Sequence, residues 1–315
     1  MLLQIKWCWG IMGERILEYC SGNIQAHVGK QEKILVENVS FVLEDGKSLA
    51  LIGETGSGKT MTALSIMKLL PENVRMLHGV LQFKGEKLKS KKAVRLLLGV
   101  DIVYIPQNGL EFLNPSKKIK YHLYDNLQKV GIKKSQMKQE AIRKLLQAGF
   151  ENGEEILEKY PFQLSGGMAQ RVTIAIAACS EAKLILADEP TNGLDFESKM
   201  QFMNLLNMLF PTAGRLIITH DITIAKLCDE TLVLCGGKMM ERGNSQELLK
   251  SPRHPYTKAL LDSLVENGMC PTPVLRHEVG FCPFYKRCRY AKEVCRSSMT
   301  YQKDGVIEWW CCKEK

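Results

Sequence analysis

The stretch GETGSGKT, residues 53–60, fits the pattern G-x-x-x-x-G-K-[ST] of a phosphate-binding loop. Its glycines let backbone N–H groups curl around the β- and γ-phosphates of a nucleoside triphosphate, Lys59 supplies a positive charge, and Thr60 offers a hydroxyl to Mg²⁺. The predicted strand before it and the predicted helix after it are the context that this motif needs. The expected binding residues are Gly53, Glu54, Thr55, Gly56, Ser57, Gly58, Lys59 and Thr60.

Two carboxylates, Asp188 and Glu189, follow the apolar run LILA, residues 184–187. A site for Mg²⁺ and a triphosphate needs an acidic element at the end of a neighbouring strand, and Asp188 is suited to hold the metal directly or through water. Glu189 is suited to orient and polarise an attacking water, as the general base of phosphoryl transfer does. An acidic pair after a strand is more often a surface turn, but downstream of a phosphate loop we expect the catalytic role.

A second anion site is indicated by LSGGMAQR, residues 164–171. A serine and two glycines open what looks like a helix, and the exposed N–H groups and positive end of a helix suit a phosphate. The chain already has a phosphate loop more than a hundred residues earlier, so this second site has no obvious anion of its own.

The elements that carry these motifs follow the strand–helix alternation of a parallel α/β sheet. SLALI (48–52), LILA and RLIIT (215–219) are expected to be buried strands, and SKMQFMNLLNML (198–209) is expected to be a helix. The helical pattern TMTALSIMKLL after the phosphate loop is expected to run until Pro71.

Other segments predict an antiparallel sheet alongside the parallel one. Apolar and polar residues alternate in ILVENVSFVLEDG and in GVLQFKGEKL, and both segments carry turn residues. TLVLCGGKMMERG predicts a hairpin with Gly236 and Gly237 at its tip. Residues 115 to 179 are mostly helical in pattern.

Four ordered motifs between about residues 31 and 250 resemble those of the ATP-binding cassette (ABC) ATPases: YIPQN (104–108), LSGGMAQR, ADEPTNGLD (187–195) and IITHD (217–221). In that family two cassettes stack head to tail. The resemblance implies that Ser165, Gly166 and Gly167 face the γ-phosphate held by the other subunit, so the partner supplies the anion.

The resemblance also implies roles for three residues outside the phosphate loop. Gln107 would touch Mg²⁺ and the attacking water and would sense a transmembrane partner. His220 would contact the γ-phosphate and Glu189, although a histidine that ends an apolar strand is by itself more often a core or edge residue. Asp195 would cross the interface between the two cassettes. The family usually stacks an aromatic residue on adenine, and here His27 is the only ring at that place, so either His27 stacks or base recognition is weak.

The C-terminal part narrows the resemblance to the ATPases of bacterial dipeptide, oligopeptide and nickel importers. SPRHPYTKALLDSL (251–264) and FCPFYKRCRYAKEVC (281–295) resemble the extension of that subfamily, as does FLNPS (112–116). In some members the tail cysteines hold a [4Fe–4S] cluster. Cys282, Cys288 and Cys295 keep the spacing, and Cys312 or Cys311 is the fourth candidate ligand.

Thiolates suit an iron–sulfur cluster or zinc, and unmetallated thiols are the remaining alternative. The spacing contains no close C-x-x-C pair, so the residues alone do not choose among an iron–sulfur cluster, zinc and unmetallated thiols. Because these cysteines lie outside the nucleotide motifs, the expected role of the tail is structural.

We therefore expect an α/β fold in which an ABC-type nucleotide-binding domain occupies residues 14–250 and a small Cys-rich C-terminal extension occupies 251–315. The domain is expected to have a P-loop parallel sheet core, an antiparallel β subdomain and a helical subdomain at about 115–179. Residues 1–13 are interpreted as an extension that is non-native or flexible, because Met12 offers a second start.

Composition and charge agree with an ordinary globular protein, since 45% of the 315 residues are hydrophobic and 24% are charged. No apolar run approaches the roughly 20 residues that span a bilayer. The odd number of cysteines, eleven, in a chain without an export signal favours a cytosolic protein over a disulfide scaffold. The net charge of +9 indicates solvated faces, or a face near anionic lipid or a membrane partner. Nucleic-acid binding is disfavoured because no aromatic residues interleave with the lysines.

The combined interpretation is an ATPase, with ATP and Mg²⁺, that lies peripherally on the cytoplasmic face of the membrane. It would power a bacterial importer of di- or oligopeptides, or of a related small solute such as a nickel complex. Its expected partners are a second cassette, identical or homologous, two integral-membrane permease subunits and an extracytoplasmic solute-binding protein. The alternatives are a soluble cassette protein that acts on ribosomes or DNA, which usually carries two cassettes in one chain, and an exporter subunit.

Overall fold

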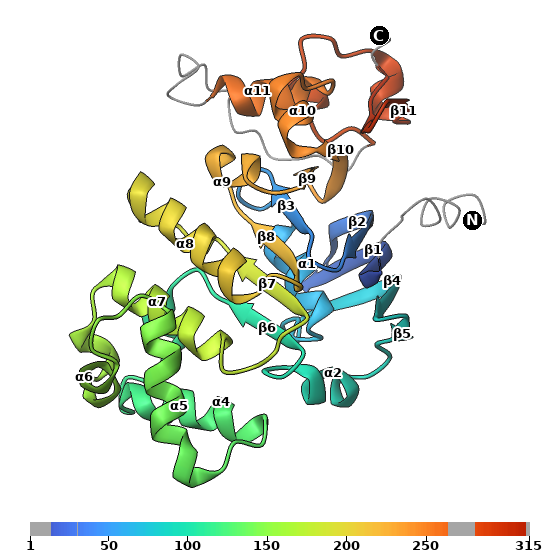
Figure 1. The fold of residues 1–315 in the computed structure, drawn as a ribbon. Helices are drawn as coiled ribbons and strands as arrows, with labels where there is room; N and C mark the ends of the chain where they lie inside the picture. The colour runs from blue at the N-terminus through green and yellow to red at the C-terminus, as the bar shows by residue number, and fades with distance from the viewer. Residues whose placement is uncertain (1–13, 30, 264–280, 313–315) are drawn as a thin grey trace. The chain divides into compact units, whose positions relative to one another are not determined.

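The computed structural model describes residues 14–29, 31–263 and 281–312. The expected N-terminal extension, 1–13, lies outside the described residues. The chain divides into two compact units (Figure 1). The first unit takes residues 1–43, 48–88 and 218–315, and the second takes 44–47 and 89–217.

The first unit contains an antiparallel sheet with the strand order β2-β1-β4-β5. Its strands are β1 (Arg15–Val28), β2 (Gln31–Glu44), β4 (Val74–Phe83) and β5 (Glu86–Lys87). Tyr19 of β1 lies opposite Leu81 of β4 and stacks on Phe41 of β2 with ring centroids 5.2 Å apart. The two segments in which apolar and polar residues alternate therefore lie in this sheet, as predicted, and β1 joins them.

The first unit also contains neighbouring strands in the order β11-β12-β10-β9-β3. They are β3 (Ser48–Ile52), β9 (Glu230–Cys235), β10 (Lys238–Asn244), β11 (Tyr301–Asp304) and β12 (Ile307–Trp310). Strand β3 is buried throughout and runs parallel to β9, as its unbroken apolar sequence predicts. The predicted β9–β10 hairpin is confirmed, with φ of 52° at Gly236 and 82° at Gly237.

The helices of the first unit are short. They are α1 (Lys59–Ile66), α9 (Ile222–Lys226), α10 (Ser245–Lys250) and α11 (Pro255–Asp262), with 3₁₀ turns η4 (Tyr285–Arg287) and η5 (Glu293–Arg296). The prediction that the helix after the phosphate loop continues to Pro71 is wrong. Lys68 takes a left-handed conformation with φ 55°, and the N–H of Leu69 donates to the carbonyl oxygen of Leu64. This contact ends the helix by satisfying one of its last carbonyls.

The second unit contains strands in the order β8-β7-β6. They are β6 (Ile102–Ile105), β7 (Leu184–Asp188) and β8 (Gly214–Ile218), and β6 runs parallel to β7. Every residue of β7 and β8 is buried, as the sequence predicts for central strands. The helices nearest to these strands in sequence are α2 (Lys91–Leu97), α3 (Gly109–Phe112) and α8 (Phe196–Leu209).

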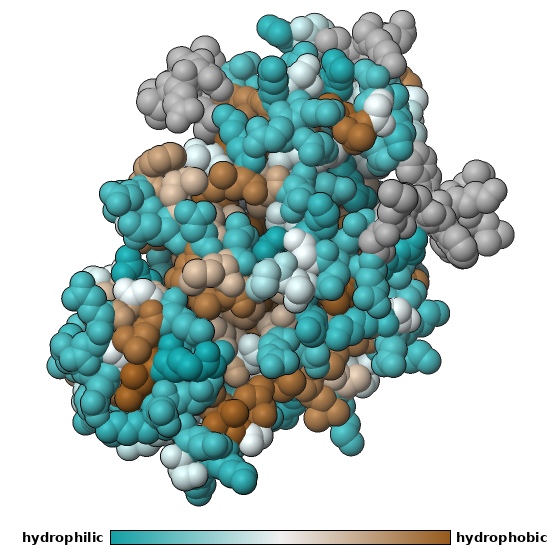
Figure 2. Space-filling model, in the orientation of Figure 1, coloured by the Kyte–Doolittle hydropathy of each residue, from teal (hydrophilic) through white to brown (hydrophobic). Residues whose placement is uncertain are grey.

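The rest of the second unit is helical. It comprises α4 (Ile119–Lys129), α5 (Lys134–Gln147), α6 (Gly153–Glu158), η2 (Pro161–Gln163) and α7 (Gly166–Ala177). On α4 the residues Ile119, Leu123 and Leu127 are buried at a spacing of four, so that one face of the helix meets the core. Helices α4, α5, α6 and α7 pack together around one apolar cluster (Figure 1). Figure 2 shows their outer surface as mostly hydrophilic, with a strip of apolar residues.

Within the described ranges, no helix combines the length and the apolar character needed to cross a membrane.

Candidate functional site

The phosphate loop follows β3 in the first unit, and its backbone demands glycine at two places. At Gly53, with φ 149°, an added Cβ would lie 2.1 Å from the carbonyl oxygen of Leu234 in β9. At Gly58, with φ 98°, it would lie 2.8 Å from Cγ2 of Val36 and 2.9 Å from the carbonyl oxygen of Leu35. Only glycine combines these backbone conformations with such close approach. Close contacts with β2 and β9 therefore fix the backbone conformation of the loop.

Polar groups inside the loop point into its curve. Lys59 is 7% exposed, and its Nζ donates to the carbonyl oxygens of Gly53 at 2.7 Å and Glu54 at 3.0 Å. Ser57 is 1% exposed, and its Oγ has no hydrogen-bond partner among the described residues. A buried hydroxyl of this kind is rare unless a ligand or a water completes it. Thr60 and Thr55 are exposed. These groups fit a triphosphate with its metal ion.

Two residues of the C-terminal extension contact the phosphate loop, and sequence reasoning missed both. Arg287 donates from Nη1 to Oε1 of Glu54 at 2.7 Å and from Nη2 to Oε2 at 3.0 Å. The hydroxyl of Tyr256 accepts the backbone N–H of Glu54 at 3.0 Å. The C-terminal extension therefore contacts the phosphate loop, in addition to the structural role expected for its cysteines. No local signal pairs residues that stand more than two hundred positions apart in the chain.

The two histidines singled out in the sequence also lie in the first unit. His220 is exposed, after Thr219, whose N–H donates to the carbonyl oxygen of Leu51 in β3. That bond places the segment before His220 beside the strand that leads into the phosphate loop. The side chain of His27, at the end of β1, is 43% exposed, and its Nδ1 lies 3.7 Å from Oε1 of Glu32.

The acidic pair stands at the end of β7 in the second unit. Asp188 is 5% exposed, and its Oδ2 accepts a hydrogen bond from the hydroxyl of Tyr104, on the neighbouring strand β6, at 3.3 Å. Burial, reinforced by the Asp188 carboxylate, raises the pKa of Tyr104, so the phenol stays a donor. Glu189 has φ 47°, a left-handed conformation that a residue with a long side chain rarely adopts. Such backbone strain concentrates at functional sites.

Gln107 is exposed on the short segment between β6 and α3. The side chain of Asn108 accepts the N–H of Leu110 at 3.1 Å and thereby caps α3. A Cβ added to Gly109 would lie 3.1 Å from the backbone of Ala169, so α3 packs closely against α7. The segment that carries Gln107 is therefore fastened to the helix that follows Ser165.

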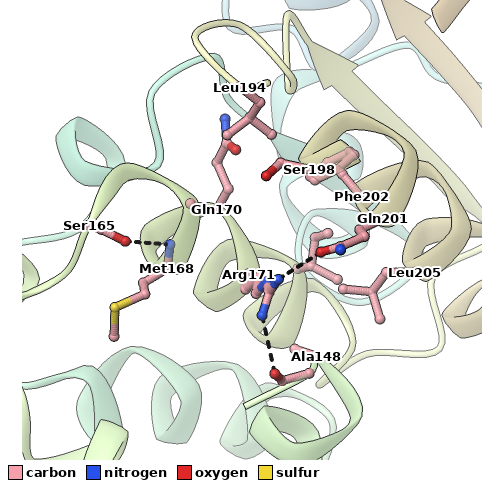
Figure 3. Close-up of a pocket in the computed structure, with 13 residues that line it drawn as sticks. Ala148, Ser165, Met168, Gln170, Arg171, Leu194, Ser198, Gln201, Phe202 and Leu205 are labelled. Carbon is pink, nitrogen blue, oxygen red and sulfur yellow. Dashed lines mark hydrogen bonds between the residues drawn. The ribbon is translucent and has the colours of Figure 1, made fainter. Parts of the chain in front are cut away.

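Ser165 caps α7, because its Oγ accepts the N–H of Met168 at 3.3 Å (Figure 3). Added Cβ atoms at Gly166 and Gly167 would meet nothing within 4 Å among the described residues, and neither glycine has a left-handed φ. Each glycine costs a helix about 1 kcal/mol relative to alanine. Neither packing nor backbone conformation in this chain requires them, so they leave the start of α7 open to an outside group.

A hollow of about 520 Å³ lies beside this helix start, between α7 and α8 (Figure 3). Arg171 crosses its wall and donates to Oε1 of Gln201 at 2.9 Å and to the carbonyl oxygen of Gly149 at 3.2 Å. These two bonds tie α7 to α8 and to the turn after α5.

Asp195 is exposed and caps α8. Its Oδ1 accepts the N–H of Ser198 at 2.8 Å, and its Oδ2 accepts the Ser198 hydroxyl at 3.0 Å. These bonds, the backbone one first, lower the pKa of Asp195, so the cap is ionised at neutral pH.

The tail cysteines are neighbours that form no disulfide among the described residues. The N–H of Cys282 donates to the carbonyl oxygen of Cys295 at 3.1 Å, and Cys312 Sγ lies 3.2 Å from the carbonyl oxygen of Ser298. Burial raises the pKa of Cys282 to about 12, and the thiols of Cys295, Cys311 and Cys288 add to the shift. In the described part of the chain, no three Cys, His, Asp or Glu side chains are arranged as a metal ion requires.

Comparison with known proteins identifies two families. The family described as "ABC transporter" matches residues 36–192, and the "Oligopeptide/dipeptide transporter, C-terminal region" matches residues 240–295. A dipeptide transport ATP-binding protein of Haemophilus influenzae is 35% identical over 279 residues, which cover 83% of this chain and 84% of that relative. An oligopeptide transport ATP-binding protein of Salmonella typhimurium is 35% identical over 280 residues, 84% of this chain and 83% of the relative.

Solved structures show the same fold. An ATP-binding cassette solved as a dimer with ADP and phosphate superposes with a TM-score of 0.66 at 22% identity. The superposition covers 73% of this chain and 99% of that one. The ATP-binding subunit of an ABC transporter gives a TM-score of 0.61 at 25% identity, with 75% and 92% covered. The expected α/β fold of an ABC cassette is thereby confirmed.

Proposed function

The chain belongs to the ABC transporter family, and on that premise we propose that it hydrolyses ATP to power the import of dipeptides or oligopeptides through a separate permease. The observation that carries the solute class is the match of residues 240–295 to the oligopeptide/dipeptide transporter C-terminal region. The names of the relatives, which are dipeptide and oligopeptide transport ATP-binding proteins, support the same class.

Within this function each motif has a defined role. The phosphate loop holds the triphosphate of ATP, with Lys59 against its charge and Thr60 on Mg²⁺. Asp188 holds the metal ion, and its hydrogen bond from Tyr104 fixes the orientation of the carboxylate. Glu189 is the general base for the attacking water. Gln107 contacts the metal and the water, and His220 contacts the γ-phosphate.

A second cassette, identical or homologous, completes the ATPase. The open helix start at Ser165, Gly166 and Gly167 is suited to a phosphate held by that partner, because nothing in the described chain closes it. Asp195, exposed at the start of α8, is suited to the interface with the same partner. Two permease subunits and an extracytoplasmic solute-binding protein are the further partners, and the chain lies peripherally on the cytoplasmic face of the membrane.

Uptake by proteoliposomes tests the solute class. Vesicles that contain this chain, its partner cassette and the permease pair are given ATP inside, and binding protein with labelled dipeptide, oligopeptide or nickel complex outside. ATP-dependent accumulation of peptide is expected. Uptake of nickel without peptide would move the chain to the nickel importers, and ATP hydrolysis without any import would contradict the proposal.

A pair of variants separates the two anion sites. Lys59→Ala should abolish ATP binding by this subunit. Ser165→Ala and Gly167→Asp should leave binding by the isolated subunit intact and reduce hydrolysis in the assembled transporter. If a variant at Ser165 or Gly167 lost affinity in the isolated subunit as completely as Lys59→Ala, that site would act within its own chain and the role of the partner would be wrong.

A [4Fe–4S] cluster on Cys282, Cys288, Cys295 and Cys312 or Cys311 is proposed on the family resemblance alone, since the described arrangement does not present a ligand set. Anaerobically purified protein should then be brown, with broad absorption near 400 nm that Cys288→Ser removes. Colourless protein with about one equivalent of zinc would favour zinc, and colourless, metal-free protein with freely titrating thiols would leave no metal site.

A further inference from the structure

We propose that Arg287, in the cysteine-rich extension, is a positioning residue for nucleotide binding: it neutralises and immobilises Glu54, and so fixes the phosphate loop in the conformation that accepts ATP. The inference rests on the proposed function, because it takes ATP as the ligand of this loop.

The contact between Arg287 and Glu54 has the geometry of a strong, directional ion pair. Two parallel bonds, 2.7 and 3.0 Å long, join the guanidinium fork to both carboxylate oxygens. The Arg287 side chain is 2% exposed and that of Glu54 is 26% exposed, so water screens the pair little on the arginine side. Pairs with this geometry are stronger and more specific than single contacts of lysine.

The guanidinium is itself held in place. It lies over the ring of Phe284, 5.1 Å from the centroid, and over that of Tyr256 at 5.9 Å. The two rings meet edge to face with centroids 5.4 Å apart, and both are buried. Arg287 therefore cannot swing away from Glu54 without losing its aromatic contacts.

Tyr256 adds a second hold on the same residue. Its hydroxyl accepts the N–H of Glu54, while the carbonyl oxygen of Glu54 accepts from Lys59 Nζ. The side chain, the N–H and the carbonyl of Glu54 are thus all bonded, two of them to the region after β10. The C-terminal extension therefore contributes to the shape of the phosphate loop.

The charge at Glu54 explains why the hold matters for binding. Position 54 is one of the variable positions of the phosphate-loop pattern, and the chemistry of the motif does not call for a carboxylate there. A free carboxylate on a loop that receives a triphosphate would repel the ligand. Arg287 cancels this charge and keeps the carboxylate turned toward the extension.

The experiment measures the dissociation constant of a fluorescent ATP analogue for the isolated full-length subunit, with thermal unfolding followed by circular dichroism for each variant. Arg287→Ala should weaken binding on the order of tenfold, because it frees the Glu54 carboxylate. Adding Glu54→Gln in the Arg287→Ala background should recover most of that loss, which a general defect in folding would not allow. Arg289→Ala, an exposed arginine of the same segment, is the matched control and should bind as the wild type does.

Tyr256→Phe keeps the test decisive if Arg287→Ala does not fold, since it removes only the hydroxyl that holds the N–H of Glu54. It should weaken binding in the same direction by a smaller factor. Unchanged affinity in both Arg287→Ala and Tyr256→Phe would overturn the inference, as would a loss that Glu54→Gln does not reduce. Lys59→Ala separates this failure from that of the proposed function: if it too bound ATP normally, the loop would not be the nucleotide site at all.

Discussion

Glu189 combines a position at the end of a buried strand with a left-handed backbone at φ 47°. A conformation of this kind costs on the order of 1–3 kcal/mol and persists only where the surroundings impose it. Asp188 is buried as the last residue of β7, and the left-handed backbone at Glu189 turns the chain away from the direction of the strand.

The first prediction concerns this carboxylate. Glu189→Gln should retain ATP binding and lower hydrolysis in the assembled transporter by roughly 10²-fold or more, because the base is lost while the phosphate loop is unchanged. Glu181→Gln, an exposed residue just before β7, is the matched control for removing one negative charge. Near-normal turnover of the Glu189 variant would exclude it as the general base.

At the scale of the element, the phosphate loop offers two glycines that differ in their surroundings. Gly53→Ala should abolish ATP binding, because its Cβ would lie 2.1 Å from the carbonyl oxygen of Leu234 and β9 would have to shift. Gly56 has φ 80°, and an added Cβ would meet nothing within 4 Å among the described residues. Gly56→Ala should therefore add only about 1–2 kcal/mol of backbone strain to the loop and weaken ATP binding less than Gly53→Ala does. Titration with nucleotide checks both, and equal affinities would show that β9 does not constrain the loop.

The junction between β10 and α11 depends on two buried ionisable groups. Glu241 is fully buried, and its carboxylate accepts the N–H of Arg253 at 2.6 Å and of His254 at 3.0 Å. His254 is 1% exposed, and its Nδ1 accepts the N–H of Tyr256 at 3.0 Å to cap α11. The hydroxyl of Tyr256 also accepts the N–H of Glu54. The His254 cap therefore positions a residue that contacts the phosphate loop.

Acid should therefore loosen the extension. Burial lowers the pKa of His254 to about 3, so the folded protein keeps it neutral while the unfolded chain binds a proton below its ordinary value of 6.5. The stability that His254 contributes is present above pH 6.5 and declines as the pH falls, by about 2 kcal/mol at pH 5. His254→Asn keeps the cap without titrating and should flatten the loss in thermal melts between pH 7 and 5.

The other group of this junction acts in the opposite direction. Burial raises the pKa of the Glu241 carboxyl above its ordinary value. The contribution of Glu241 to folding stability is therefore largest at low pH, and it falls as the pH rises above that ordinary pKa. The comparison of His254→Asn with the wild type isolates the histidine, because Glu241 is common to both. Identical pH slopes in the two proteins would show that His254 does not control the junction.

At the scale of the whole molecule, local patterns predicted β2, β3, β4, β7 and β8, the β9–β10 hairpin and the phosphate loop, because each is encoded by neighbouring residues. Strands β1 and β6 were not predicted. The pairs Tyr104–Asp188 and Arg287–Glu54 were missed because long-range packing creates them. The β11–β12 hairpin was also missed, although its two-residue turn, Gly305 and Val306, has glycine at the first position, where hairpin turns favour it. The roles of Gln107, His220, Asp195 and His27 stay predictions.

A truncated chain that ends at Ser263 should be unstable and should self-associate. It lacks β12, which pairs with β10 through Glu241 opposite Trp309, and so it exposes the edge of β10. Removal of residues 313–315 alone is the matched control. Size-exclusion chromatography and thermal melting of both chains check this, and a monomeric truncated protein as stable as the control would contradict it.

The unbroken strand order from β12 through β10 and β9 to β3 has a consequence for amide hydrogen exchange. Strands joined in one hydrogen-bonded sheet tend to open together as a cooperative unit, so their amides exchange at similar rates. Protection of the amides of β12 should thus follow that of β3, and should increase together with it when nucleotide binds. The last described strand of the chain would in this way serve as a reporter of events at the phosphate loop.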